Sequence, residues 1–392
     1  QLDPVDRYED YLISEGVLTP EEQEKINQQV KKSINDALEI AFAEEAVQAQ
    51  MEKELGDVYA PFTQTVVEPS GASTEKRFID GISDGLRESM EKYPNLVLMG
   101  QDIGDYGGVF KITDGFKAQF GGDRVRNTPL CESAIIGAGL GLSIKGFKAM
   151  VEMQFADFVS VGFNQIVNNL AKIHYRWGQH ADVVIRMPTG AGTAAGPFHS
   201  QSNEAWFFHT PGLKIVYPSN PHDAKGLLNA ALEDPNPYLY FEHKLLYRSI
   251  SGPVPDNYYT VEVGKAALAA TGTQVSIITY GMGVHWATKV VEELGISADI
   301  LDLRTLLPWD KEAVAATVKK TGKVIFLQED TLTGGIGAEI CAWISEYCFA
   351  SLDAPVMREG SLDTPVPFAP NLEKQFLPID RFKVKLQELI AF

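Results

Sequence analysis

Glu132 is a lone carboxylate at the start of a long uncharged stretch. It belongs to the segment NTPLCESAIIGAGLG, Asn127 to Gly141, and the residues that follow it, Ser133 to Leu142, carry no charge. An ionised group is costly to bury among apolar residues unless it has a partner. Two interpretations follow. Either Glu132 stabilises the amino end of a helix through the helix dipole, or it is kept there for chemistry.

His199 is the histidine whose surroundings best suit proton transfer. It lies in GAGTAAGPFHSQSNE, Gly190 to Glu204, after a loop of small residues that lets another molecule approach the backbone closely. A loop imidazole among hydroxyl and amide groups can donate or shuttle a proton near neutral pH. The alternative is a structural histidine hydrogen-bonded to its own loop. The loose G-x-G-x-x-A at the start of this segment does not lead into a predicted helix, which disfavours a dinucleotide site.

A third segment, VEMQFADF from Val151 to Phe158, combines an amide with two aromatic rings. Gln154 is at the end of a predicted strand, where α/β proteins place ligand-binding groups. Phe155 and Phe158 can stack on a flat ring, or they pack in the core. The sequence contains no P-loop, zinc-protease motif or calcium loop, so metal-assisted hydrolysis loses support.

The elements around these segments alternate between helices and short apolar strands, which predicts parallel sheets covered by helices on both faces. In the first unit we expect helices at 78–92, 132–145, 158–177 and 221–232, and strands at 95–99, 147–153, 182–187, 213–217 and 237–241. A Pro- and Gly-rich break at 251–255 precedes a second α/β unit. There we expect strands at 274–280, 298–303 and 323–328, and helices at 283–294, 311–320, 337–347 and 381–390.

The first 60 residues are helical in pattern and strongly acidic, with 15 acidic and five basic residues. Thr19-Pro20-Glu21-Glu22 predicts a helix start, because threonine can cap it, proline suits its first position and a glutamate follows three residues after the cap. Four apolar residues spaced by four then form one stripe, Ile26, Val30, Ile34 and Leu38. Residues 61–74 contain the turn residues Pro, Gly and Ser and are predicted to be a linker.

Size and composition indicate a globular protein of more than one domain. The chain has 392 residues, of which 45% are hydrophobic and 22% charged, and its net charge is −18. This negative charge argues against binding to nucleic acid or to an anionic membrane. The three cysteines form no metal-binding pattern and fit a reducing compartment, and no apolar run has the length of a membrane span. We therefore expect a cytoplasmic protein, and the first residue, Gln1, is interpreted as the start of a fragment or processed product.

Together these segments resemble the β subunit of the thiamine-diphosphate-dependent 2-oxo acid dehydrogenases, the E1β family. The likeness runs from about Lys76 to Phe392 through the ordered blocks MGQDIGDYGGVF, NTPLCESAIIG, EMQFADF, FHSQS, FEHKLLYR, LDLRTLLPWD and LTGGIGAEI. It implies a transketolase-like pyrimidine-binding domain with a parallel sheet at 75–250, and a transketolase C-terminal-like α/β domain at 251–392. Residues 1–60 resemble instead the C-terminal tail of the family's α subunit, which implies that the parent protein is an α–β fusion.

The resemblance also implies roles for individual residues. The glutamate of the family motif, here Glu132, binds a ring nitrogen of the cofactor's aminopyrimidine and activates the cofactor. His199 assists proton transfer and stabilises charge when the acyl group passes to a lipoyl group. The residues implied to line the aminopyrimidine pocket are Leu130, Gln154 and Phe158.

Two further implications concern protons and ions. The family usually has a glutamate where this chain has Gln101. A proton path between paired active sites would therefore lack this carboxylate, and Asp102 would have to take its place. The cofactor's diphosphate is held through Mg²⁺ by a GDG motif of the family's α subunit, and this chain contains no GDG. Asp234 and Asn236 match positions that bind a structural K⁺ in the family, and the alternative there is a plain capped turn.

We therefore expect the β part of a branched-chain 2-oxo acid dehydrogenase E1 (3-methyl-2-oxobutanoate dehydrogenase), which decarboxylates its substrate and passes the acyl group to a lipoyl-bearing E2. The blocks FEHKLLYR and FADF favour the branched-chain enzymes over pyruvate or acetoin dehydrogenase, the near alternative. The expected partners are the E1α part, a second E1β in a dimer, E2 and the 2-oxo acid. A hypothesis of another class is that the chain alone is a non-catalytic assembly module, half an active site that binds no cofactor without the α part.

Overall fold

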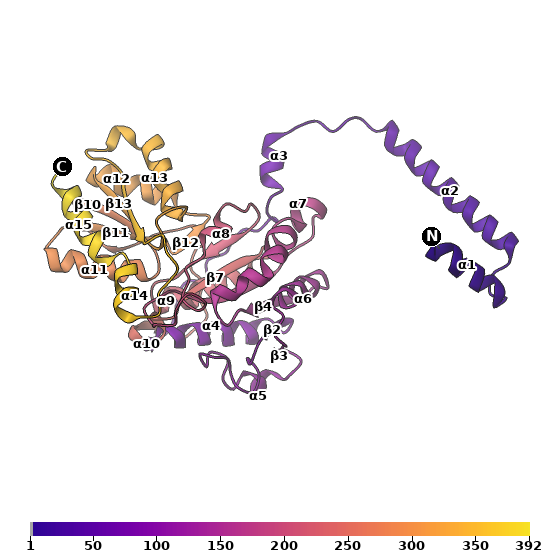
Figure 1. Ribbon diagram of the computed structural model, residues 1–392, viewed down its shortest axis with the longest axis horizontal. Helices are drawn as coiled ribbons and strands as arrows, with labels where there is room; N and C mark the ends of the chain where they lie inside the picture. Colours follow the sequence, from indigo (N-terminus) through magenta and orange to yellow (C-terminus); the bar gives the residue numbers. More distant parts are fainter. Residues whose placement is uncertain (1–2) are drawn as a thin grey trace. The chain divides into compact units, whose positions relative to one another are not determined.

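The computed structural model describes residues 3–392, and the chain divides into two compact units, Gln1–Leu55 and Gly56–Phe392. The smaller unit contains the helices α1 (Pro4–Ser14) and α2 (Pro20–Ala43), and α3 (Met51–Gly56) spans the division (Figure 1). The predicted start of α2 is confirmed, because Glu22 N donates to Thr19 Oγ1 over 3.2 Å and Thr19 N donates to the Glu22 carboxylate over 2.9 Å. The side chains of its apolar stripe are between 45% and 55% exposed.

The larger unit begins with a segment that is fastened to it by hydrogen bonds. Residues 61–72, within the predicted linker, form no helix or strand. Gln64 Nε2 donates to Val261 O over 2.9 Å, and Val67 N donates to Thr260 Oγ1 over 2.9 Å while Thr260 N donates back to Val67 O over 3.0 Å. The segment therefore lies along the body of this unit.

A short two-stranded ribbon comes next. β1 (Ser73–Arg77) pairs antiparallel with β8 (Ser251–Pro255), at the place where the sequence predicted a break between domains. The two prolines of β8 are compatible with a strand because each strand of a two-stranded ribbon has an unpaired edge.

A seven-stranded sheet forms the centre of the first domain. Its strand order is β12-β6-β7-β5-β4-β2-β3, and neighbouring strands are parallel except for β12 with β6. The strands are β2 (Leu96–Gly100), β3 (Val125–Asn127), β4 (Lys148–Glu152), β5 (Val183–Thr189), β6 (Lys214–Val216), β7 (Tyr238–His243) and β12 (Thr305–Leu307). The five strands predicted for this domain are present, whereas β3 and β12, of three residues each, were not predicted.

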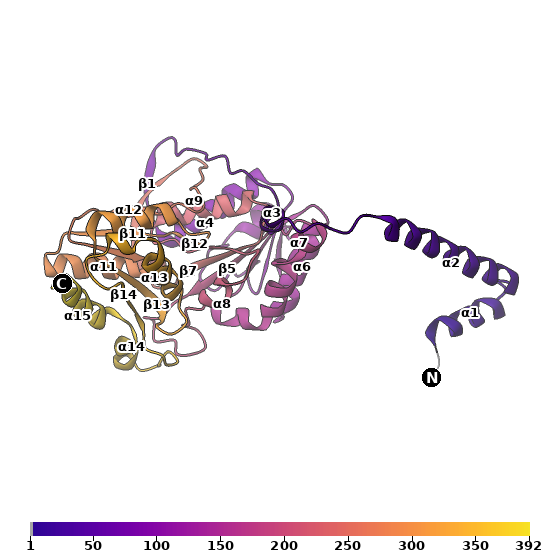
Figure 2. The ribbon, with the colours of Figure 1, turned by 90° about the horizontal axis from the view of Figure 1, so that it is seen from above.

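Helices cover both faces of this sheet (Figures 1 and 2). They are α4 (Phe78–Lys92), α5 (Phe116–Phe120), α6 (Glu132–Ile144), α8 (Ala205–Phe208), α9 (Pro221–Glu233) and α10 (Leu246–Ser249). Successive side chains of a strand point to opposite faces. Leu96 and Leu98 of β2 therefore pack in one core with α4 and α9, while Val97 and Met99 pack in another with α6.

The long helix predicted at 158–177 is wrong. The segment contains three short pieces, a 3₁₀-helix η1 (Ala156–Gly162), a π-helix η2 (Gln165–Leu170) and α7 (Ile173–Trp177). A Cβ at Gly162 would lie 2.3 Å from the Ile136 side chain of α6, so the two segments meet at a residue that must be small. Asn168 Nδ2 donates to Asn164 Oδ1 over 2.8 Å, and such amide side chains compete with regular backbone bonding.

A five-stranded sheet forms the second domain, in the order β14-β13-β10-β11-β9, with only β9 antiparallel to its neighbour. Its strands are β9 (Ala267–Ala270), β10 (Val275–Thr279), β11 (Ala298–Asp302), β13 (Val324–Thr331) and β14 (Met357–Ser361). Its helices are α11 (Met282–Leu294), α12 (Lys311–Thr321), α13 (Ile336–Tyr347), α14 (Pro370–Phe376) and α15 (Ile379–Ile390), with a 3₁₀-helix η3 (Phe349–Ser351). α11 and α15 pack on one face of the sheet, and α12 and α13 pack on the other.

One hydrophobic core continues from the first domain into the second. Tyr217 of the first domain packs against Tyr280 of the second with ring centroids 5.2 Å apart, and both belong to a single buried cluster. β12 also belongs to the second domain in sequence, yet it completes the edge of the first sheet. Within residues 3–392, no helix combines the length and apolarity needed to cross a membrane.

Candidate active site

The predicted site residues follow the carboxyl ends of four neighbouring parallel strands, β5, β4, β2 and β3. The last residues of these strands are Thr189, Glu152, Gly100 and Asn127. The site residues that come after them are His199, then Gln154 and Phe158, then Gln101, and finally Leu130 and Glu132. Because parallel strands end at the same edge of a sheet, the topology brings all six to the edge where open α/β sheets bind ligands.

Glu132 and Gln101 form a buried pair at this edge. Glu132 is the first residue of α6 and is 9% exposed, and Gln101 is 5% exposed. Gln101 Nε2 donates to Glu132 Oε1 over 3.0 Å, the single hydrogen bond that this carboxylate receives from the described residues. Gln101 Oε1 is buried and has no partner within residues 3–392. The pair therefore has unused hydrogen-bonding capacity at the mouth of a helix, which suits a polar group of a bound ligand.

His199 lies among aromatic rings. Its ring centroid is 4.7 Å from that of Phe155 and 5.5 Å from that of Phe158, with nearly perpendicular ring planes. Both phenylalanines are partly exposed, which favours a site lining over the alternative that they pack in the core. The structure shows no hydrogen bond between the imidazole and residues 3–392, which disfavours a histidine fixed by its own loop. The imidazole packs against two rings and keeps both nitrogens available.

The remaining predicted residues have different surroundings. Gln154 Nε2 donates to Asp102 Oδ2 over 3.1 Å, so Asp102 pairs with Gln154 while Gln101 pairs with Glu132. Asp102 is exposed and has a φ of 59°. Leu130 is 81% exposed. The structure therefore joins Gln101 to Glu132 and Phe158 to His199, whereas Leu130 presents its side chain to solvent.

Asp234 and Asn236 lie elsewhere, at the amino end of β7 and thus at the opposite edge of the sheet. Asn236 Nδ2 donates to Asp234 Oδ1 over 2.7 Å, Tyr238 OH donates to Asp234 Oδ2 over 2.8 Å, and Lys214 forms an ion pair with the same carboxylate. Asn236 Oδ1 accepts from Ala60 N over 2.8 Å. These donors occupy the oxygens a cation would need, so the contacts favour the capped turn over the K⁺ site. Within residues 3–392, no group of three or more His, Cys, Asp or Glu side chains is placed to hold a metal ion.

A buried ion-pair network beneath the site was not predicted from the sequence. Arg186 of β5 is 1% exposed and forms ion pairs with Glu152 of β4 and Glu242 of β7. Tyr247 OH also donates to Glu242 over 2.6 Å, and burial raises the pKa of the Glu242 carboxyl. The network ties three neighbouring strands together next to their carboxyl ends. A charged residue inside the otherwise apolar run 183–187 is the signal that could have indicated such a partner.

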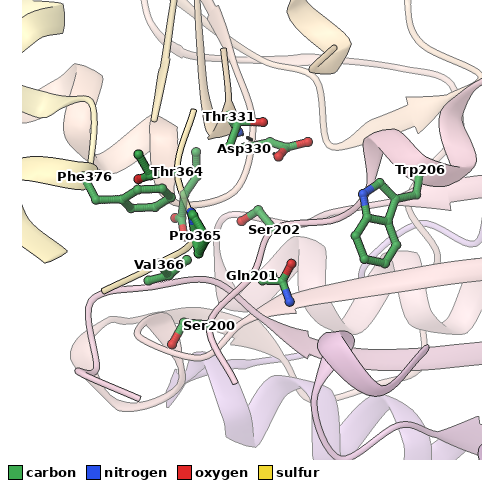
Figure 3. Close-up of a pocket in the computed structure, with 11 residues that line it drawn as sticks. Ser200, Gln201, Ser202, Trp206, Asp330, Thr331, Thr364, Pro365, Val366 and Phe376 are labelled. Atoms are coloured by element: carbon green, nitrogen blue, oxygen red, sulfur yellow. Dashed lines mark hydrogen bonds between the residues drawn. The ribbon is translucent and has the colours of Figure 1, made fainter. Parts of the chain in front are cut away.

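A cavity of about 120 Å³ lies between the two domains, and the residues that follow His199 in sequence form part of its lining. It is lined by Ser200, Gln201, Ser202 and Trp206 of the first domain and by Glu329, Asp330, Thr331, Thr364, Pro365, Val366 and Phe376 of the second. Figure 3 shows Trp206 on one side of this cavity and Phe376 on the other. Behind its wall, Tyr280 OH donates to the Glu204 carboxylate over 2.6 Å. Burial raises the pKa of both Glu204 and Asp330, and the charge of Asp330 adds to the rise at Glu204.

Comparison with known proteins agrees with this architecture. Residues 75–249 match the family model of the transketolase pyrimidine binding domain, residues 264–381 that of the transketolase C-terminal domain, and residues 1–50 that of the dehydrogenase E1 component. Among solved structures, the chain resembles a split-gene transketolase, an inactive β4 tetramer, with a TM-score of 0.66 and 21% identity over 82% of this chain and 99% of that one. The predicted fold, a transketolase-like pyrimidine-binding domain followed by a C-terminal-like α/β domain, is confirmed.

Curated relatives are similar over most of their length. The 2-oxoisovalerate dehydrogenase subunit beta of Bacillus subtilis is 46% identical over 324 residues, which are 80% of this chain and 98% of the relative. The mitochondrial subunit of the same name from Dictyostelium discoideum is 43% identical over 80% of this chain and 85% of its own length. The pyruvate dehydrogenase E1 component subunit beta of Bacillus subtilis is 42% identical over 76% and 94%. The chain therefore belongs to the family of E1 β subunits of the thiamine-diphosphate-dependent 2-oxo acid dehydrogenases.

Proposed function

We propose that this chain is the β part of a branched-chain 2-oxo acid dehydrogenase E1, acting with an E1α part on substrates of the 2-oxoisovalerate type. The observation that carries the substrate class is the 46% identity to a 2-oxoisovalerate dehydrogenase β subunit over 98% of that protein. Pyruvate is the second candidate, because a pyruvate dehydrogenase β subunit is 42% identical. Acetoin dehydrogenase is a further alternative of the same class.

The buried pair of Glu132 and Gln101 fits the aminopyrimidine of thiamine diphosphate. A carboxylate with one hydrogen bond and an amide oxygen with none offer acceptors to a ring N–H and an amino group. When bound, the cofactor supplies a carbon nucleophile for the keto carbon and an electron sink that lets carbon dioxide leave. Glu132 would hold the ring nitrogen, and Gln101 would fix the carboxylate that does so. Gln154, Phe158 and Leu130 are proposed to line the same ring.

His199 is proposed to act on the reacting end of the substrate. Its imidazole packs nearly perpendicular to two phenyl rings and has no hydrogen bond to the described residues, so either nitrogen can exchange a proton with a bound group. A neutral imidazole accepts a proton, and an imidazolium donates one and stabilises developing negative charge. Both properties suit transfer of the acyl group to the lipoyl group of an E2 component.

The rest of the active site is assigned to partners. Mg²⁺ and the cofactor's diphosphate are proposed to bind mainly to the E1α part, and a second E1β to complete a dimer. Residues 1–50, which match the dehydrogenase E1 component model, are proposed to be a piece of the α sequence fused to β. The structural K⁺ at Asp234 and Asn236 stays a prediction, although protein donors contact the oxygens that would bind it.

A substrate panel with the reconstituted α and β parts tests the substrate class. We expect kcat/KM for 3-methyl-2-oxobutanoate to exceed that for pyruvate and for acetoin, and the reverse order would reject the branched-chain assignment. Glu132→Gln should abolish decarboxylation, since a neutral amide cannot hold the ring nitrogen in the same way. The matched control is Glu346→Gln, which changes an exposed glutamate on α13 in the same manner.

Titration of the chain alone with thiamine diphosphate and Mg²⁺ tests the hypothesis of a non-catalytic module. We expect weak or no binding without the α part and tight binding once it is added. Tight binding by the isolated chain would contradict the division of the site between two parts. Assembly with α but no turnover of any 2-oxo acid would favour the module.

A further inference from the structure

The loop that carries His199 has several residues with positive φ angles, and one of these residues is not glycine. Gly190, Gly192 and Gly196 have φ values of 93°, 93° and 73°, which glycine adopts freely. Ala194 has a φ of 53°, in the left-handed region where a Cβ is unfavourable. A loop with a strained non-glycine residue keeps one conformation only if its surroundings hold it.

Two carboxylates of the second domain hold this loop. Glu373 of α14 accepts from Gly192 N over 2.9 Å and from Ala194 N over 3.0 Å. Glu329 of β13 accepts from Ala191 N over 2.6 Å. Successive backbone N–H groups in such left-handed turns form a concave anion site. Here the anions are side chains of the protein itself, 179 and 138 residues away from the loop in sequence.

Both carboxylates are buried, which strengthens their hydrogen bonds to the loop. Glu329 is 5% exposed and Glu373 is 4% exposed. The second oxygen of Glu329 contacts His243 Nε2 at 2.6 Å, while Leu245 N donates to His243 Nδ1 over 3.3 Å, so the nitrogen facing Glu329 carries the proton. Hydrogen bonds to ionised acceptors are shorter and stronger than neutral ones. A loop pulled out of this arrangement would remove the donors of the buried Glu373 carboxylate and leave Glu329 with His243 alone.

The first domain completes the enclosure of the loop. Lys244 Nζ donates to Gly190 O over 2.6 Å. A Cβ at Gly190 would lie 2.1 Å from His243 Nε2, and a Cβ at Gly196 would lie 2.3 Å from the ring of Phe368, a residue of the second domain. The loop is therefore fitted between two domains along most of its length, up to the residues next to His199.

We propose that Glu329 and Glu373 are positioning residues that set the conformation of the 190–196 loop and, through it, the place of the His199 imidazole during acyl transfer. This inference rests on the proposed role of His199. It assigns the second domain a part in the chemistry of the first domain. Glu373 is the sharper test, because it receives donors from two loop residues and is not paired with a histidine.

Hydrogen exchange measures the clamp on the full 392-residue chain without any assay of activity. In Glu373→Ala, amides in the peptide covering 190–199 should exchange roughly 10- to 100-fold faster than in the wild type, because two charge-assisted bonds are lost. Glu373→Gln should restore much of the protection, since its carbonyl oxygen can still accept from the loop. Peptides from β10 should be unchanged in both variants, and so should every peptide in the control Glu346→Gln.

Reconstituted enzyme then separates positioning from general stability. In Glu373→Ala we expect acyl transfer to a lipoyl domain to fall roughly 10- to 100-fold, because small misplacements of a reacting group are that costly. Decarboxylation measured with an artificial electron acceptor should stay within about twofold of wild type, because it depends on Glu132. Glu373→Gln should recover most of the transfer rate. Faster loop exchange with unchanged acyl transfer would overturn the proposal, and so would equal loss of both reactions.

His199→Ala in the same assays keeps the two proposals distinguishable. If that variant transfers acyl groups normally, the role of His199 fails while the exchange result for Glu373 still stands. If His199→Ala loses transfer and Glu373→Ala does not, the positioning role alone is rejected.

Discussion

Replacing Gln101 by glutamate would place a second carboxylate against Glu132. The side chains keep the same size, and the two facing atoms are 3.0 Å apart. At an effective dielectric constant near 20, two unit charges at that distance repel by about 5 kcal/mol, or about four pKa units. Both groups are nearly buried, so little solvent screens this repulsion. The variant pair must therefore keep one shared proton up to a pH well above the ordinary range of a carboxyl group.

The sign of the effect on stability follows from that shared proton. Since the folded-state pKa of the pair is raised above its unfolded value, the variant should lose stability as the pH rises from about 5 towards 8, by up to about 5 kcal/mol. Urea unfolding of Gln101→Glu and wild type between pH 5.5 and 8.5 measures the difference. Gln387→Glu, which changes an exposed glutamine of α15, is the control. In reconstituted enzyme, the kcat/KM profile for the 2-oxo acid should gain an ionisation in the same range. A variant whose stability parallels wild type across this range would show that the two side chains are not in contact.

Three further substitutions probe the framework. Burial raises the pKa of Asp302 to about 7, so the free energy of unfolding of the native protein should fall by up to about 4 kcal/mol between pH 4 and 7. Asp302→Asn should flatten this fall, as measured by urea unfolding above pH 5.5. Arg186→Met leaves the two buried carboxylates that it bridges without their cation, and should cost about 3–5 kcal/mol by the same method. Gly190→Ala combines a φ of 93° with a contact of 2.1 Å to His243 Nε2, so it should lower thermal stability by about 1–3 kcal/mol or more and slow acyl transfer.

The parts of the fold that depend on local pattern were predicted well from sequence. α4 spans Phe78–Lys92 as predicted, and the capping box at Thr19 begins α2. The failures occur where distant segments decide the local structure. The segment at 158–177 is apolar enough for a helix, but its contact with α6 at Gly162 breaks the regular pattern. β12 is three residues long and becomes a strand only because β6 lies beside it.

The site shows the same division. The sequence placed Gln154 alone at a strand end, and the topology of the sheet brings the other site residues to the same edge. The bond from Gln101 to Glu132 depends on how β2 and the start of α6 are packed, and no spacing in the sequence encodes it. Asp157 lies within the segment Val151 to Phe158, but its partner is known only from the structure. Its Oδ1 accepts hydrogen bonds from Gln201 N and Nε2.

The chain passes from the first domain to the second at residues 251–255. The contacts around the candidate site, however, come from both domains. The second domain contributes a strand to the first sheet, one side of the core around Tyr217 and Tyr280, and the carboxylates that hold the His199 loop. Each contribution places residues of the second domain next to residues that position the candidate site. The proposed placement of the His199 imidazole accounts for one of these contributions, the contacts of the Glu329 and Glu373 carboxylates with the loop.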